Sequence, residues 1–388
     1  MKDKRPVNLK PYCIILMLFL FMPILQMLTK AIDPVNLNGI EPVTKYEHLS
    51  KASFASGKYQ KAIERYLVKS NSLWSYALTL GNQFYHDFFQ QISPNLNNSV
   101  LVGNDGYFFQ SMYLGSFNRR KPIDIPRSDI LIARLKEFDE YLKSRGITLV
   151  LLVSPNLINV YPEYLPKSYV DPTRLERQNT YDYFTPRLTE SNLNFIDSFK
   201  IIKDLADKED SPRYFQPTGS HLNDLGACIQ VNEIMKVIEK TKNQRAEYLD
   251  CSNYVMKYPP LTKDIDLVDI ANLAFPESTY VPSPELMEQK VGFSDDYKPS
   301  MLLVGSSFLF GVQEQLERFE IAKRSTLLFY NRNVRESSSQ KMKGKPRKNN
   351  WIEKLSDYDV VLLEVNLSSL GRMGYGFSKE VLTQAKPK

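Results

Sequence analysis

The sequence predicts an α/β domain with a parallel sheet flanked by helices, preceded by an N-terminal transmembrane anchor and a helical stalk. Three observations support this prediction. An uncharged apolar run lies near the N-terminus, a polar stretch with regularly spaced aromatic residues follows it, and the remaining chain alternates short apolar runs with amphipathic segments. This alternation is typical of parallel sheets, in which loops at the carboxyl ends of the strands form the site.

The predicted anchor is the stretch PYCIILMLFLFMPILQML, which carries no charge over 18 residues. That length is at the lower end for a membrane-spanning helix. The basic segment MKDKRPVNLK precedes it, which predicts a cytoplasmic N-terminus and a translocated globular part. A cleaved signal peptide is the alternative, but TKAIDP is a poor cleavage site and favours an uncleaved anchor. The predicted divisions are a tail at 1–10, the anchor at 11–28, the stalk or N-terminal cap at 29–98, and the α/β domain at 99–388.

The elements of the domain follow from local patterns. SVLVGNDGYFFQS predicts a strand, an Asn-Asp-Gly turn and a second strand. RSDILIARLKEFDEYLKSRG predicts a helix capped by Ser128 or Asp129 and ended by Gly146. A helix is also predicted for LNDLGACIQVNEIMKVIEK, and a mobile loop for RESSSQKMKGKPRKNNW. Buried strands are predicted in ITLVLLVSPN, NLNFIDS, SMLLVGSSF, STLLFYN and YDVVLLEVN.

Charge and cysteine content narrow the functional classes. A net charge of +6 over 388 residues is too weak to indicate nucleic acid binding, although it is compatible with an anionic glycan partner. Cys13 lies in the predicted anchor, so Cys228 and Cys251 are the only pair in the exported part. They form either a disulfide, as an oxidising compartment allows, or two buried free thiols. With no CxxC and no clustered His and Cys, we expect no zinc site.

Two stretches contain candidate catalytic groups. In MLLVGSSFLFG an apolar strand is followed by Gly305 and two serines, and such a turn can expose a nucleophilic hydroxyl near helix-start amides. A simple helix cap is the alternative. A nucleophilic serine needs a base, usually histidine, and the chain has only His48, His86 and His221. His48 lies near the anchor and His86 among aromatic residues, so His221, just before a predicted helix, is the best candidate.

Four motifs, VLVGNDGYFF, VSPNLINVYPEYLP, PTGSHLNDLGA and VGSSF, occur in an order that resembles the AlgJ/AlgX-like family of alginate O-acetyltransferases. Members of that family are SGNH-hydrolase-like, membrane-anchored or periplasmic proteins of exopolysaccharide acetylation, and the resemblance covers roughly residues 75–388. It implies Ser307 as the nucleophile and His221 as the base. It also implies a location at the inner membrane with a periplasmic domain, a membrane-bound O-acyltransferase partner that supplies acetyl groups, a polysaccharide acceptor, and neither metal nor nucleotide cofactor.

The sequence departs from the family at the residue that should orient the histidine. Gly219 stands where the family's Asp-x-His motif has aspartate. A carboxylate fixes the imidazole tautomer and stabilises the imidazolium, so its loss would slow the chemistry strongly. We expect Asp224 to substitute for it, with Asp197 or a backbone carbonyl as alternatives. Asp224 could instead be an ordinary acidic residue in the first turn of a helix.

The resemblance also suggests residues around the nucleophile. Amides near Ser307 and Phe308 would hold the oxyanion, and Tyr330, Asn331 and Asn366 would shape the acyl pocket. In NVYPEYLP, Tyr161 and Tyr164 are candidates for glycan contact, with packing as the alternative. Two other functions stay open: an acetylesterase, in which water rather than sugar attacks the acyl-enzyme, and a catalytically degenerate scaffold that binds polymer in an acetylation complex.

Overall fold

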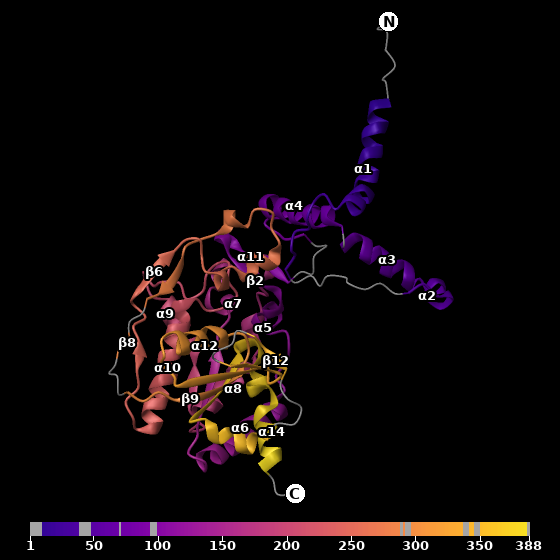
Figure 1. Cartoon of the computed structure of the whole chain (residues 1–388). Helices are drawn as coiled ribbons and strands as arrows, with labels where there is room; N and C mark the ends of the chain where they lie inside the picture. The colour runs from indigo at the N-terminus through magenta and orange to yellow at the C-terminus, as the bar shows by residue number, and fades with distance from the viewer. Residues whose placement is uncertain are drawn as a thin grey trace. The chain divides into compact units, whose positions relative to one another are not determined.

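A computed structural model describes residues 10–38, 48–69, 71–93, 99–287, 290–291, 296–336, 341–344 and 350–385. The chain divides into two compact units (Figure 1). The first comprises Met1–Val100 and Val268–Ser278, and the second comprises Leu101–Leu267 and Thr279–Lys388. Nearly all of the predicted cytoplasmic tail, residues 1–9, lies outside the described residues.

The first unit is mainly helical in its described parts. It contains α1 (Lys10–Thr29), α2 (Lys51–Ala55), α3 (Lys58–Lys69) and α4 (Ser72–Phe89). Within α1, Pro11–Thr29 has a mean hydropathy of 2.2 and is long and apolar enough to cross a membrane. A signal sequence has the same composition, so this helix by itself fits both interpretations of the N-terminus.

The second unit is built on a seven-stranded sheet. Five strands run parallel, because β10 pairs with β9, β9 with β13, β13 with β3, and β3 with β4. The two remaining strands extend one edge in antiparallel fashion. In sheet order the strands are β12 (Lys343–Gly344), β11 (Asn333–Glu336), β10 (Arg324–Phe329), β9 (Ser300–Gly305), β13 (Val360–Asn366), β3 (Thr148–Ser154) and β4 (Phe195–Asp197). The predicted α/β fold with a parallel sheet is confirmed.

Helices cover both faces of this sheet (Figure 1). Alternate residues of β3, β9 and β13 pack with α6 (Ile125–Lys143), α8 (Thr180–Thr189), α13 (Trp351–Lys354) and α14 (Phe377–Ala385) in one hydrophobic core. The other face carries α9 (Ser198–Ala206), α10 (Asp224–Lys242) and α12 (Leu309–Arg318). Because β3 and β13 are buried along their whole length, they appear in the sequence as continuous apolar runs.

The predicted start of α6 is wrong by four residues. The side chain of Asp124, rather than Ser128 or Asp129, caps the helix by accepting a hydrogen bond from the Arg127 amide at 3.1 Å. The reason is Pro126, which the first turn of a helix tolerates because the amide that proline lacks has no partner there.

Shorter elements complete the second unit. They are β1 (Val100–Val102, its last two residues in this unit), β2 (Phe108–Gln110), α5 (Leu114–Phe117), α7 (Leu157–Val160), β5 (Tyr248–Leu249), β6 (Tyr254–Lys257), α11 (Asp266–Ala271, its first two residues here), β7 (Ser283–Leu286), β8 (Lys290–Val291) and the 3₁₀ segment η9 (Leu367–Gly376). Cys228 and Cys251 form a disulfide that ties α10 to the turn after β5. In the segment predicted as a mobile loop, β11 ends at Glu336 and β12 lies at Lys343–Gly344. Residues 337–340 and 345–349 of that segment lie outside the described residues.

Candidate active site

The candidate nucleophile lies in the turn between β9 and α12. β9 ends at Gly305 and α12 begins at Leu309, so Ser306, Ser307 and Phe308 fill the turn at the carboxyl edge of the sheet. A Cβ atom at Gly305 would lie 2.5 Å from the Oε2 atom of Glu364, which excludes a side chain at this position. The Oγ atom of Ser307 lies 2.8 Å from Nε2 of His221, within hydrogen-bonding distance.

His221 is held in a short loop before α10. The loop is fixed by a bridge between Phe215 and Leu222 and by the side chain of Asn223, which caps the helix. The ring of Phe308 lies 5.1 Å from the imidazole, centroid to centroid. These local contacts orient the imidazole toward Ser307, which lies 86 residues later in the sequence.

The other imidazole nitrogen faces a carboxylate that the sequence did not suggest. Nδ1 of His221 lies 3.1 Å from Oδ2 of Asp266 and 3.0 Å from Oγ of Ser220. Ser220 donates its amide to Oδ1 of Asp266 at 2.7 Å and its hydroxyl to Oδ2 at 2.5 Å. Burial raises the pKa of Asp266, but the hydrogen bonds from His221 and Ser220 outweigh it and leave the pKa below its ordinary value. Asp266 is therefore held ionised beside the imidazole.

Neither carboxylate expected from the sequence occupies this place. Asp224 is buried and bound to Lys263 at 2.5 Å, and its Oδ2 accepts the amide of Leu286 at 2.9 Å. Asp197 accepts the hydroxyl of Tyr181 at 2.6 Å and caps α9. The structure thus places both of these side chains in contacts that hold helices and strands together, and it places Asp266 beside His221.

Gly219 explains why the carboxylate comes from a distant segment. A Cβ atom at this position would lie only 3.0 Å from the backbone oxygen of Asp264. The same backbone oxygen accepts the hydroxyl of Thr218 at 2.8 Å, so the segment leading to Asp266 packs directly on the turn. A side chain at position 219 would therefore press on the backbone of the segment that supplies the carboxylate here.

A second carboxylate lies beneath the nucleophile turn. Glu364 on β13 is fully buried, and its Oε2 accepts the amide of Ser306 at 2.6 Å and the Ser306 hydroxyl at 2.9 Å. Burial raises the pKa of Glu364 to about 7 in spite of these hydrogen bonds. The Phe308 amide donates to the Ser306 hydroxyl at 3.3 Å, while the Ser307 amide has no acceptor within the described part of the chain. The Ser307 amide is thus the better placed oxyanion donor.

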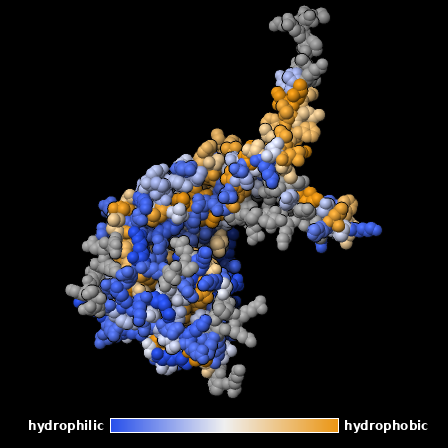
Figure 2. Space-filling view, in the orientation of Figure 1, coloured by the Kyte–Doolittle hydropathy of each residue, from blue (hydrophilic) through white to orange (hydrophobic). Residues whose placement is uncertain are grey.

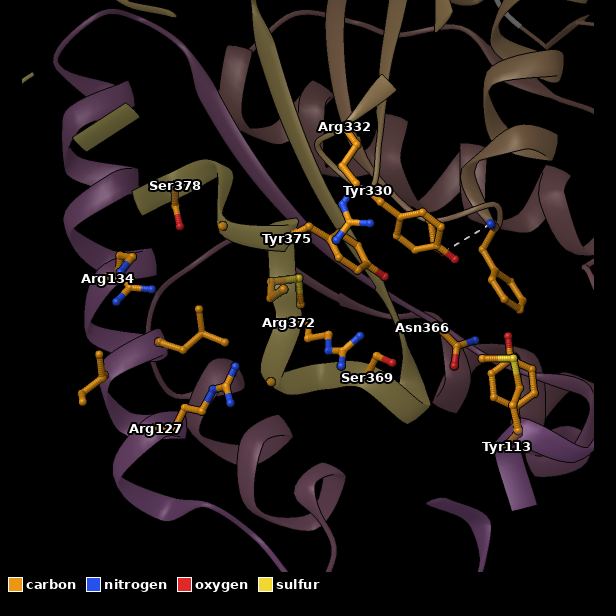
Figure 3. Close-up of a pocket in the computed structure, with 18 residues that line it drawn as sticks. Tyr113, Arg127, Arg134, Tyr330, Arg332, Asn366, Ser369, Arg372, Tyr375 and Ser378 are labelled. Carbon is orange, nitrogen blue, oxygen red and sulfur yellow. Dashed lines mark hydrogen bonds between the residues drawn. The ribbon is translucent and has the colours of Figure 1, made fainter. Parts of the chain in front are cut away.

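A cavity of about 710 Å³ opens beside the turn (Figure 3). Ser306 and Phe308 line it next to the candidate nucleophile, and Tyr113 and Tyr375 line its walls. Burial raises the pKa of both tyrosines, so both hydroxyls stay protonated. Four arginines also line it: Arg127 and Arg134 from α6, Arg332 after β10, and Arg372 from η9. Its lining holds no aspartate or glutamate, and no ion pair joins these arginines to other described residues.

Of the three residues expected to shape the acyl pocket, two line the cavity and one does not. Tyr330 and Asn366 line the cavity, and burial raises the pKa of the Tyr330 hydroxyl. Asn331 does not line it, because its amide donates to Glu380 at 3.1 Å.

The two tyrosines expected to contact glycan are also absent from the cavity lining. Tyr161 is buried, accepts the Tyr214 amide at 3.0 Å, and has a pKa raised by burial to about 12. Tyr164 stacks on Tyr107, with ring centroids 3.9 Å apart. The contacts of both tyrosines match the packing alternative.

Several site residues were missed by the sequence analysis: Ser220, Asp266, Glu364, Tyr113, Tyr375 and the four arginines. Ser220 directly precedes the histidine, and Glu364 interrupts an apolar strand, so both carried a usable signal. The arginines come from three separate segments and carry no shared pattern.

The comparisons with known proteins identify the family. Residues 100–319 match the family described as the SGNH hydrolase-like domain of the acetyltransferase AlgX. The chain belongs to this family. The match covers more than half of the chain, includes both His221 and Ser307, and confirms the resemblance seen in the four motifs.

Solved structures give more distant likenesses. The O-acetyltransferase domain of Pseudomonas putida AlgJ is 17% identical, with a TM-score of 0.43 over 70% of this chain and 92% of that one. Pseudomonas aeruginosa AlgX is 15% identical, with a TM-score of 0.41 over 72% of this chain and 67% of that one. Bacillus cereus PatB1 is 11% identical, with a TM-score of 0.43 over 70% and 96%. No match was found among curated protein sequences.

Proposed function

We propose that this member of the AlgX acetyltransferase family is a membrane-anchored extracytoplasmic O-acetyltransferase. In this proposal Ser307 carries an acetyl group to hydroxyls of a cell-surface polysaccharide. The observation that carries the proposal is the continuous contact from Ser307 through His221 to Asp266, at 2.8 and 3.1 Å. A serine, a histidine and a carboxylate in this order form an activated nucleophile.

The proposed reaction has two steps. His221 Nε2 takes the proton of Ser307 as Oγ attacks the acetyl carbonyl, and the donor leaves with that proton. The acetyl ester on Ser307 is then attacked by a sugar hydroxyl, whose proton passes to His221 and back to the serine oxygen. Asp266 stabilises the imidazolium in both steps, and the Ser307 amide is placed to donate to the oxyanion.

The cavity supports an acidic acceptor. Four arginines, which have no carboxylate partner among the described residues, concentrate positive charge in the cavity that Ser306 and Phe308 also line. Guanidinium groups bind carboxylates in a bidentate manner that favours this class of ligand. An acidic polysaccharide, laid across the cavity with one hydroxyl at Ser307, would satisfy both the charge and the chemistry.

Two features support the location. α1 is long and apolar enough to act as the anchor. Disulfides such as Cys228–Cys251 form and persist in oxidising compartments, so this bond favours an exported domain. Acetyl groups made in the cytosol must then cross the membrane, so the proposal includes a membrane-bound O-acyltransferase as the partner that delivers them.

The main reason for considering a catalytically degenerate scaffold no longer applies. It depended on the missing aspartate at Gly219, whereas Asp266 lies beside His221. The esterase alternative uses the same groups with water as the acceptor, and the arginine-lined cavity favours a bound glycan over water.

The test is Ser307→Ala in the full chain. We expect loss of polymer acetylation in cells, loss of labelling by a serine-reactive probe, and loss of acetyl transfer from an activated ester to an acidic oligosaccharide. Ser211→Ala, at a half-buried serine outside the site, is the matched control and should behave like the wild type. Unchanged acetylation in the Ser307→Ala cells would exclude this serine as the nucleophile, and free acetate as the only product would indicate an esterase.

A further inference from the structure

The buried face of α4 is polar and its exposed face is apolar, which is the reverse of the usual pattern for a helix in water. Its buried side chains are all polar: Ser72, Ser75, Thr79, Asn82 and Gln83. These groups hold the helix to its own unit by hydrogen bonds to backbone. Asn82 donates to the carbonyl of Ala271 at 2.8 Å, and Gln83 accepts the amide of Phe275 at 3.1 Å.

The outward face of α4 is apolar. Tyr76, Leu80, Phe84, Phe88 and Phe89 are 41%, 53%, 52%, 72% and 55% exposed. The first four follow one another at intervals of four residues, so they line one face of the helix. The rings of Phe84 and Phe88 are in contact, with centroids 4.7 Å apart, which makes this outer stripe continuous.

The stripe also lacks charge. From Ser72 to Tyr85 the helix contains no ionisable group except tyrosine hydroxyls, and His86 and Asp87 pair with each other at its C-terminal end. A helix that faces water presents its polar side outward and its apolar side to the core. α4 does the reverse, and a contiguous exposed apolar surface of this kind marks contact with a membrane or another macromolecule.

We propose that the outer stripe of α4 lies in the lipid headgroup and acyl boundary of the membrane that α1 anchors. The inference rests on the proposed anchoring by α1, with which α4 is in contact. The side chain of Asn71, the N-cap of α4, donates to the carbonyl of Pro23 in α1 at 3.1 Å. α4 lies at the C-terminal end of α1 (Figure 1), and apolar surface appears on both helices (Figure 2).

The chemistry of the stripe favours lipid over a protein partner. It follows a single helix and is rich in aromatic side chains, which concentrate at the membrane interface. An interfacial helix beside a spanning helix would fix the tilt of the first unit at the bilayer, because an amphipathic helix lies in the plane of the interface with its apolar face buried.

The test uses the full chain in vesicles of phosphatidylcholine and phosphatidylglycerol. In a Cys13→Ser background, single cysteines replace Leu18 in α1, Phe88 in the stripe, or Leu175, which is 69% exposed in the second unit. Each cysteine carries an environment-sensitive fluorophore. At Phe88→Cys we expect blue-shifted emission, quenching by a lipid-borne quencher placed near the headgroup, and protection from aqueous iodide. Leu175→Cys should show the opposite behaviour.

The outcomes separate this inference from the anchoring itself. Quenching by lipid at Leu18→Cys with iodide access at Phe88→Cys would overturn the inference while leaving the anchor intact. Iodide access at both positions would overturn both. A fluorophore at Leu80→Cys, which lies two turns earlier on the same face, repeats the measurement if the first variant fails to fold.

Discussion

The carboxylate of Asp266 is the residue on which the proposed chemistry depends most after Ser307 and His221. Asp266→Asn keeps the shape but removes the charge that stabilises the imidazolium and selects its tautomer. We expect kcat for acetyl transfer to fall by about 10³- to 10⁴-fold with little change in KM. Steady-state kinetics with an activated acetyl ester would measure this.

Asp224→Asn is the matched control for that variant. It breaks the ion pair with Lys263, which should lower stability but leave kcat of the folded protein near the wild-type value. A slow Asp224→Asn enzyme beside a normal Asp266→Asn enzyme would reverse the assignment made here.

At this scale the sequence predicted Ser307 and His221 but not their partner. Histidine is rare in the chain, and the serine follows a strand-to-turn pattern, so both carry a local signal. Asp266 lies 45 residues beyond His221, and no helical or strand period relates the two positions. Its role depends on how the 264–266 segment packs on Gly219, which only the folded chain shows.

Among the elements, the turn between β9 and α12 depends on β13. Glu364 binds the amide and hydroxyl of Ser306 from below and so fixes the residue next to the nucleophile. Its raised pKa also has a consequence for stability. Between its ordinary value of 4.5 and about 7, the unfolded chain loses the proton that the folded chain retains. Stability therefore falls as pH rises through this window.

Glu364→Gln removes that dependence. We expect the wild type to lose about 3 kcal/mol from this group between pH 4.5 and 7, while the variant loses none of it. Urea denaturation in detergent, followed by the buried Trp351 in a Trp74→Phe background, reports on the second unit alone. Equal pH dependence in the two proteins would show that Glu364 is ionised in the folded state throughout this range.

Elements were predictable where burial leaves a pattern in the sequence. β3 and β13 are buried on both faces and appear as unbroken apolar runs. α4 was predictable as a helix but not in its orientation, because a period of 3.6 residues identifies two faces without saying which one is buried. Its polar face turned inward became evident only from the hydrogen bonds of Asn82 and Gln83.

For the whole molecule, the distribution of charge matters more than its sum. A net charge of +6 is small for 388 residues, yet four arginines gather in one cavity beside the nucleophile. Composition alone therefore gave only compatibility with an anionic glycan. The clustering arises because the fold brings α6, the end of β10 and η9 to one edge of the sheet.

This clustering predicts acceptor selectivity that depends on salt. Arg127→Ala and Arg134→Ala should each raise KM for an acidic oligosaccharide by about 10- to 100-fold, as expected when a charge-assisted hydrogen bond is lost. KM for a neutral oligosaccharide, and hydrolysis of an activated acetyl ester, should change little.

Raising ionic strength should raise KM for the acidic acceptor in the wild type and less so in the variants, because salt screens the field of the arginines. Arg120→Ala, at an exposed arginine outside the cavity, is the matched control. If the wild type accepts acidic and neutral oligosaccharides equally at low salt, the arginines do not select the acceptor.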